Sequence, residues 1–156
     1  MENSDSLLAF ALDRQRYALS LSSVENSIRS VEITSLPKAP SIVKGVINVH
    51  GRIIPVIDVR KRFGLSQREL GPSDHMIIAH TSKRHVALVV DRVIGVIEAT
   101  GREIVKTETV VPHTEYVAGV IKLPDGLILI HDLALFLSLD EEAALNDALK
   151  ESGQPE

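Results

Sequence analysis

Two segments of the chain, residues 45–59 and 119–133, are versions of one another. They align without a net gap, and glycine, valine, isoleucine and a closing aspartate recur at matching offsets. Each copy has the pattern of a strand, a glycine-containing turn, a second strand and an aspartate before a short helix. A chain that contains one supersecondary unit twice commonly folds into two small modules packed together. The repeat therefore predicts paired β-barrels that serve as a docking surface, not a cleft around one catalytic centre.

Composition narrows the partners that such a chain could bind. The 156 residues carry a formal charge of −4 and only 3% aromatic residues, so nucleic acid is not an expected partner. The chain has no cysteine, which fits a reducing compartment. Its first residues are acidic, unlike a signal peptide, and no apolar run approaches the ~20 residues that span a bilayer. We expect a soluble, cytoplasmic protein that does not insert into a membrane.

Short strands with polar turns dominate the rest of the chain. Residues 7–12 and 17–21, and residues 76–79 and 86–90, read as hairpins, while residues 24–36 and 92–99 read as further strands. A single helical turn is expected at residues 41–44, after Pro40. Many short strands at close spacing, with few helices, predict an all-β barrel architecture. We expect one domain over residues 1–156, with subdomains near 7–70 and 73–139, and an exchange of strands between them is left open.

The end of the chain reads as a helix. Ser138 and Glu141 have the spacing of a capping box. An apolar stripe follows, made of Ala144, Leu145, Ala148 and Leu149. We therefore expect a C-terminal helix over residues 139–151.

Several segments together resemble the CheW-type coupling proteins of chemotaxis. The fragments that carry the resemblance are Val24 and residues 33–40, 45–51, 55–58, 90–93 and 119–132, and they extend the likeness from Phe10 to about Leu139. The resemblance implies a pair of five-stranded SH3-like barrels, in agreement with the duplicated unit.

The same resemblance implies a non-enzymatic adaptor without cofactors. CheW-type proteins couple the cytoplasmic tip of chemoreceptors to a CheA-type histidine kinase. Two barrels offer two surfaces, and a bivalent bridge makes the second contact effectively intramolecular. Two alternatives stay open: an adaptor of a divergent chemosensory or surface-motility pathway, and a small metal-binding regulator or enzyme.

Matching this chain residue by residue to the CheW-type family implies a receptor-facing surface. Its members are Val24, Asn26, Asn48, Val49, His50 and Gly51. In the alternative interpretation, Val24 and Val49 belong to the core, and Asn48 and Gly51 only make a turn.

This surface departs from the family at two positions. The family usually has Glu where this chain has Asn26, and Arg where it has His50. Loss of both charges together is physically coherent, because loss of one alone would leave an uncompensated charge. We therefore expect Asn26 and His50 to lie near each other and the receptor-facing surface to be altered.

No dependable motif marks the kinase side. Two adjacent valines, Val110 and Val111, lie in the polar segment 106–114, where they could anchor a partner. They are the candidate kinase-binding residues.

Other polar residues are expected to have structural roles. Asp58 and Asp132 fit helix caps better than a catalytic pair. Residues 60–62 (Arg-Lys-Arg) fit a solvated helix face, with a basic complement to an acidic partner as the alternative. Asp91 fits a turn. We expect no catalytic residues. The spacing of the six histidines fits no compact metal site, so we expect them to be solvated and not to bind a metal. These are His50, His75, His80, His85, His113 and His131.

Overall fold

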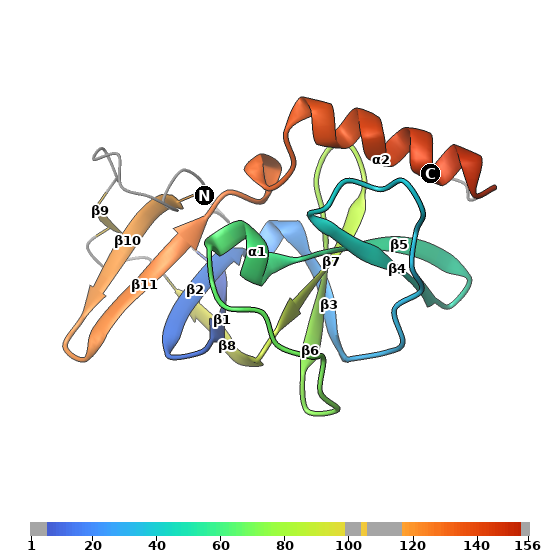
Figure 1. Cartoon of the computed structure of the whole chain (residues 1–156). Coiled ribbons are helices and arrows are strands. Elements are labelled where there is room, and N and C mark those ends of the chain that lie inside the picture. The colour runs from blue at the N-terminus through green and yellow to red at the C-terminus, as the bar shows by residue number, and fades with distance from the viewer. Residues whose placement is uncertain (1–5, 99–103, 106–116, 154–156) are drawn as a thin grey trace.

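Two curved sheets make up most of the protein (Figure 1). The computed structural model describes residues 6–98, 104–105 and 117–153. The first sheet has five strands in the order β3-β6-β7-β5-β4. Their bounds are β3 Val24–Arg29, β4 Val43–Val49, β5 Arg52–Ile57, β6 His75–His80 and β7 His85–Val90.

The second sheet has the order β8-β1-β2-β11-β10-β9. Its strands are β1 Ser6–Leu12, β2 Gln15–Ser20, β8 Arg92–Glu98, β9 Ile104–Val105, β10 Val117–Leu123 and β11 Gly126–His131. The predicted all-β fold with two packed five-stranded units is confirmed, and the two-residue β9 adds a sixth strand to the second sheet.

The duplicated segments form equivalent hairpins, β4–β5 and β10–β11. In each, the second strand pairs in parallel with a strand outside the repeat: β5 with β7, and β11 with β2. A capped helical turn follows each hairpin, α1 (Val59–Phe63) or η3 (Leu133–Leu135). Asp58 Oδ1 accepts the amide of Lys61 at 3.0 Å, and Asp132 Oδ1 accepts that of Ala134 at 3.1 Å. Both predicted caps are confirmed.

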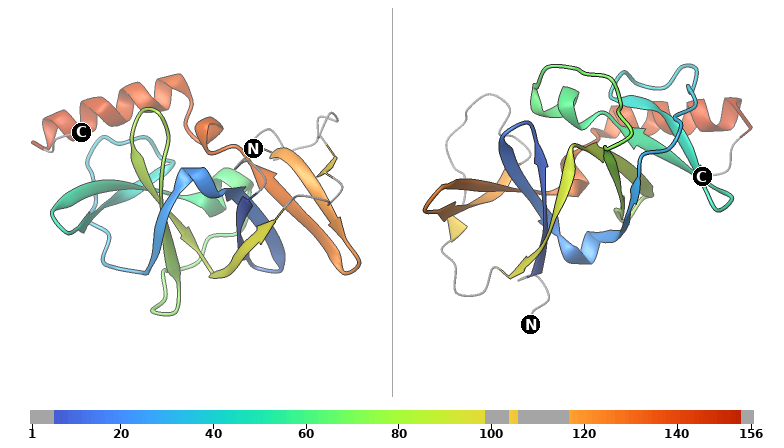
Figure 2. Two further views of the ribbon diagram at one scale, coloured as in Figure 1. Left: turned by 180° about the vertical axis from the view of Figure 1, so that it is seen from behind. Right: turned by 90° about the horizontal axis from the view of Figure 1, so that it is seen from below.

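The sheets do not divide the chain into a first and a second half. Strands β1 and β2 lie in the sheet of the second repeat, and β6 and β7 lie in the sheet of the first. Figure 2 shows these strands from behind and from below. A boundary near residues 70–73 therefore separates strands that share a sheet.

Two predicted local elements differ from the structure. Strand β3 ends at Arg29, and beyond it only Thr34 forms an isolated bridge, to Val46. The helical turn expected at residues 41–44 is wrong, because β4 begins at Val43. The amide of Asp58 donates to the carbonyl of Ile42 at 2.7 Å, which holds this segment beside the end of β5.

The largest apolar core lies where the two sheets pack together. It joins Phe10 and Leu19 of the second sheet to Ile77 and Leu88 of the first. Smaller apolar clusters occupy each sheet separately. Since apolar burial is the main favourable term in folding, this shared core makes one unit of the two sheets.

Aromatic rings gather in that core. Phe63, Phe136 and Tyr17 pack around His131, whose ring lies 4.2 Å from Phe63 and 5.4 Å from Tyr17, centroid to centroid. Phe10 stacks on Tyr17 at 5.7 Å. Burial lowers the pKa of His131 to about 4. The expectation of solvated histidines is wrong at this position, because the imidazole replaces an apolar residue of the first repeat inside the core.

Helix α2 (Leu139–Glu151) lies across the end of the five-stranded sheet (Figure 1). The predicted capping box of Ser138 and Glu141 is confirmed. Arg62 Nη2 donates to both carboxylate oxygens of Glu141 at 2.8 Å, and Arg84 Nε donates to Glu142 at 2.7 Å. The expected solvated face of α1 is therefore wrong for Arg62, which holds α2 in place.

Removing one side chain tests how much α2 depends on its apolar face. Leu145 is fully buried, so Leu145→Ala is expected to lower the free energy of unfolding by about 3 kcal/mol. Leu139, in the first turn of the same helix, is 77% exposed, and Leu139→Ala is expected to have an effect below about 0.5 kcal/mol. Urea denaturation of both variants measures the difference, and equal losses would contradict this packing.

Candidate partner-binding surface

The predicted receptor-facing residues lie at one rim of the five-stranded sheet. Val24 and Asn26 are at the start of β3, and Asn48 and Val49 end β4. Val24 and Val49 are half-buried against the apolar cores, whereas the other four predicted residues are exposed. The valines thus contribute to packing as well as to this rim.

A tight turn fixes the β4–β5 end of the rim. His50 and Gly51 have φ angles of 52° and 87°, and Val49 faces Arg52 across the hairpin. Two central residues with positive φ match the twist of the flanking strands. Asn48 Oδ1 accepts the amide of Gly51 at 2.9 Å. Asn48 and Gly51 therefore do make the turn, and His50 is presented at its tip.

An ion pair that sequence reasoning missed closes the rim. Arg52 Nη2 of β5 donates to Glu25 Oε1 of β3 at 2.6 Å, although β3 is an edge strand and two strands separate it from β5. This hydrogen bond holds the pKa of the Glu25 carboxyl below its usual value. Both side chains stay partly exposed, 38% for Glu25 and 46% for Arg52.

The pairing expected from the sequence was between Asn26 and His50. Within the described part of the chain, no hydrogen bond or ion pair joins those two side chains. The connection is made instead by Glu25, which adjoins Asn26, and by Arg52, which lies two residues after His50. The only sequence signal for the Glu25–Arg52 pair is the presence of opposite charges close to Asn26 and His50. That signal predicts a pair only if the register of the strands is known.

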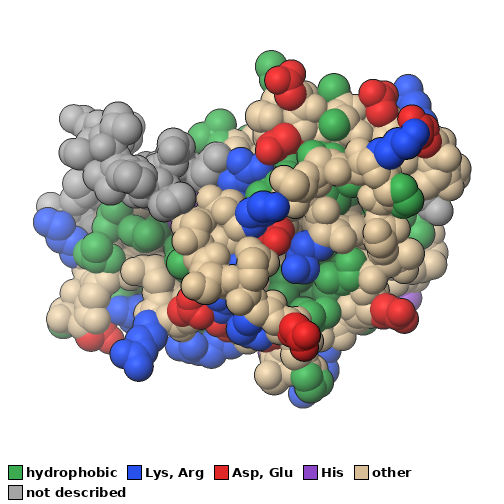
Figure 3. Space-filling view, in the orientation of Figure 1, with side chains coloured by type: hydrophobic (Ala, Val, Ile, Leu, Met, Phe, Trp, Pro, Cys, Tyr) green, Lys and Arg blue, Asp and Glu red, His purple; other side chains and the backbone are tan. Residues whose placement is uncertain are grey.

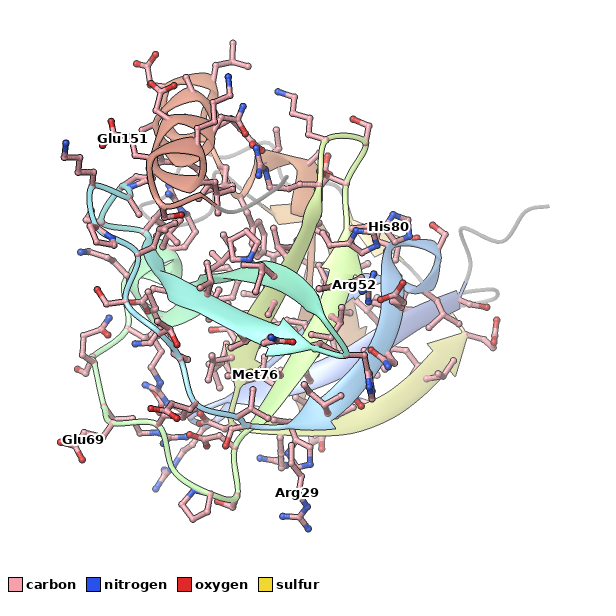
Figure 4. The ribbon with its side chains drawn as sticks, turned by 90° about the vertical axis from the view of Figure 1, so that its right-hand side faces the viewer. Arg29, Arg52, Glu69, Met76, His80 and Glu151 are labelled. Atoms are coloured by element: carbon pink, nitrogen blue, oxygen red, sulfur yellow. The ribbon has the colours of Figure 1, made fainter. Side chains whose placement is uncertain are left out.

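Two histidines extend this charged rim. His80 and His85 face each other across the β6–β7 hairpin, with ring centroids 5.8 Å apart. His85 Nε2 lies 3.5 Å from Glu25 Oε2. Figure 4 shows Arg52 and His80 on the same side of the sheet. Among the residues that the structure describes, no three His, Asp or Glu side chains are grouped so that they could hold a metal ion.

Two adjoining hollows lie along the rim. One, of about 360 Å³, runs between β5, the β6–β7 turn and α2. Lys83, Arg84 and His85 line it and also line the second hollow, which reaches Glu25. Ile54, Pro55 and Leu149 give the first hollow apolar walls. An open groove with apolar walls and a charged rim suits a protein partner.

A second exposed apolar feature lies on the other sheet. Ile94 and Val96 of β8 are 45% and 54% exposed, on the edge strand of the six-stranded sheet. A bulge opposite Ala9 and Phe10 interrupts the pairing of this strand with β1. Bulges discourage pairing with a further strand, so side-chain contact with a partner explains these residues better than strand addition.

The face of the molecule seen in Figure 3 carries mixed charge. Figure 3 shows acidic and basic side chains next to one another on this face, with no wide field of one sign. No helix in the described ranges has the length and apolar character needed to cross a membrane. Val110 and Val111 lie outside the described residues.

Comparison with known proteins decides the family. The sequence model of the CheW-like domain matches residues 6–141. This chain belongs to the CheW-like domain family. Chemotaxis protein CheW of Thermotoga maritima is 34% identical over 127 residues, which cover 81% of this chain and 83% of that protein. Chemotaxis protein CheW of Klebsiella aerogenes is 28% identical over 145 residues, which cover 92% of this chain and 87% of that protein.

The CheW-like fold agrees with a solved structure as well. The crystal structure of the scaffolding protein TtCheW from Thermoanaerobacter tengcongensis matches with a TM-score of 0.79 at 31% sequence identity. The match covers 88% of this chain and 95% of that one. The two-sheet architecture and the family resemblance predicted from the sequence are both confirmed.

Proposed function

We propose that this chain is a non-enzymatic adaptor that couples chemoreceptors to a CheA-type histidine kinase in the cytoplasm. Family membership supports this function, and so do the names of the relatives, which describe chemotaxis and scaffolding proteins. The observation that carries the adaptor function is that each sheet has an exposed surface suited to binding a protein. These surfaces are the groove beside Arg52 and the apolar edge of β8. An adaptor needs two such surfaces on one rigid body.

The receptor side of the proposed adaptor is the rim that begins at β3 and the β4–β5 turn. It includes Val24, Asn26, Asn48, Val49, His50 and Gly51, with Glu25 and Arg52 joining its two ends. A receptor tip is a helical hairpin, which would lay an apolar stripe along such a groove and place polar groups on the charged rim.

Substitution of Arg52 tests the receptor side. Arg52→Ala leaves Glu25 without its guanidinium partner and changes the charge of the rim, so affinity for a receptor cytoplasmic fragment is expected to fall about tenfold. Calorimetric titration measures the change. Arg16→Ala is the matched control, because Arg16 forms a comparable exposed pair with Asp125 at 3.0 Å on the other sheet. Equal affinities of the two variants would contradict the assignment.

The kinase side is proposed to include Val110 and Val111. Adjacent valines in a polar segment could fill an apolar pocket of the kinase regulatory domain. Val111→Asp is expected to weaken kinase binding by at least about tenfold, because a carboxylate would have to be desolvated in the contact. Binding that is unchanged while the circular dichroism spectrum stays native would remove these residues from the proposal.

The departures at Asn26 and His50 favour a second candidate, an adaptor of a divergent chemosensory or surface-motility pathway. This pathway would use receptors that do not require the family's usual charges. A pull-down with the Asn26→Glu, His50→Arg double variant distinguishes the two. Gain of receptors absent from the unmodified bait supports the divergent pathway, whereas an unchanged set of receptors argues against it.

A further inference from the structure

At the β7–β8 junction a single residue, Asp91, carries the chain from one sheet to the other, whereas the crossing from β2 to β3 uses Leu21–Ser23. Strand β7 of the five-stranded sheet ends at Val90, and β8 of the six-stranded sheet begins at Arg92. The amide of Asp91 donates to the carbonyl of Ala11 in β1 at 3.0 Å. The geometry at Asp91 therefore affects how the two sheets are set against each other.

Two guanidinium groups converge on the carboxylate of this residue. Arg60 Nη2 donates to both oxygens of Asp91, at 3.1 and 3.0 Å, and Arg68 Nη2 donates to Oδ1 at 2.5 Å. The amide of Asp13 donates to Oδ2 at 2.6 Å. Although burial raises the pKa of Asp91, these hydrogen bonds hold it below its usual value. The carboxylate is thus bound from three sides.

Each arginine also ties Asp91 to another part of the fold. Arg60, in α1 after β5, pairs with Asp13 in the β1–β2 turn of the other sheet at 2.7 Å. Arg68 pairs with Asp74, which precedes β6, at 2.7 Å. Arg60 and Asp74 are only 9% and 3% exposed. These five residues, Asp13, Arg60, Arg68, Asp74 and Asp91, form what we call the Asp91 cluster.

The cluster was not expected from the sequence, which placed Arg60 on a solvated helix face and Asp91 in a simple turn. Apolar contacts between the sheets are non-directional, so they favour contact without fixing one angle. Charge-assisted hydrogen bonds from a planar guanidinium are directional. The cluster supplies this directional element at the β7–β8 junction, where the chain changes sheets through one residue.

We propose that Asp91, Arg60 and Arg68 are positioning residues that fix the angle between the two sheets. This angle is a property of the free molecule. Its consequence for signalling rests on the proposed function: an adaptor whose two surfaces are held at one angle joins two partners in one geometry, whereas a loosened adaptor binds each partner and assembles them poorly.

Distance measurement between the sheets tests the inference without any partner. The chain has no cysteine, so spin labels at Arg29→Cys in β3 and Lys122→Cys in β10 are unique. Double electron–electron resonance is expected to give one narrow peak in the parent protein. Asp91→Asn keeps the shape of the side chain and removes its charge, and it is expected to broaden or shift that peak.

Arg68→Met is the second variant, because the Arg68 side chain is 41% exposed and its loss is better tolerated than that of Arg60. Arg16→Met is the control, since the Arg16–Asp125 pair lies within one sheet. An unchanged peak in both cluster variants, or equal broadening in the control, would overturn the inference. If Asp91→Asn does not fold, as judged by circular dichroism, Arg68→Met decides alone.

A second readout separates the inference from the proposed function. With receptor fragment and kinase present, the cluster variants are expected to keep each single affinity within about twofold and to lose co-assembly of the three components. If the variants loosen the sheets but co-assembly stays normal, the cluster still fixes the angle, and the claim that co-assembly needs a fixed angle is wrong. Absence of binding by the parent protein would instead contradict the proposed function alone.

Discussion

Gly45→Ala is expected to lower the free energy of unfolding by about 3 kcal/mol or more, through backbone strain and overpacking together. Gly45 lies in β4 with a φ angle of 153°, which side chains other than hydrogen rarely allow. A Cβ atom there would lie 2.3 Å from the carbonyl oxygen of Thr34 and 2.8 Å from Ile33 Cγ2. Thr34 cannot withdraw easily, because its amide and carbonyl both pair with Val46 at 2.8 Å.

Gly71→Ala is the matched control for this prediction. The nearest atom to a Cβ at Gly71 is Asp74 Oδ2 at 3.9 Å, an ordinary contact. Its expected effect stays within about 1 kcal/mol. Guanidinium denaturation of both variants measures the two losses, and a Gly45→Ala protein as stable as Gly71→Ala would show that Thr34 does not crowd this strand.

Acid is expected to remove about 2.5 kcal/mol of stability between pH 7 and pH 4.5 through His131 alone. The pKa of His131 is lowered to about 4 from 6.5 because the ring is buried among aromatic side chains. The unfolded chain therefore binds the proton more readily than the folded one. This contribution is fully present above about pH 6.5 and is lost as the pH falls toward 4.

His131→Phe isolates that effect. A phenyl ring keeps the stacking against Phe63 and has no proton to bind, so most of the loss between pH 7 and pH 4.5 is expected to disappear. Urea denaturation at the two pH values gives the comparison. Asp74, Asp91 and Glu141, whose pKa values are lowered, lose their contribution at still lower pH in both proteins. An identical pH dependence in wild type and variant would contradict the burial of a neutral imidazole.

Local features of this fold follow from the sequence because they depend on neighbouring residues. The repeat predicted both hairpins, and Asp58, Asp132 and Ser138 predicted three caps, since a cap needs only its own first helical turn. The family resemblance predicted two packed modules, and the fold agrees.

Features that depend on distant residues could not be read in the same way. Arg60 looks like any surface arginine until the β1–β2 turn and the β7–β8 junction are brought beside it. Glu25 and Arg52 likewise meet only because the five-stranded sheet curls, so that its edge strand β3 approaches β5. His131 occupies a position that is apolar in the first copy of the repeat. This match indicates a buried imidazole, as the structure has it, better than a solvated one.

Co-purification of three components tests the adaptor assignment most directly. A receptor cytoplasmic fragment and the regulatory domain of a CheA-type kinase from the same cell would be mixed with and without this protein and separated by size. One complex containing all three is expected only when this protein is present, and Arg52→Ala is expected to reduce its amount. Competition of the two partners for this protein, with no three-component complex at any ratio, would contradict a bridging role.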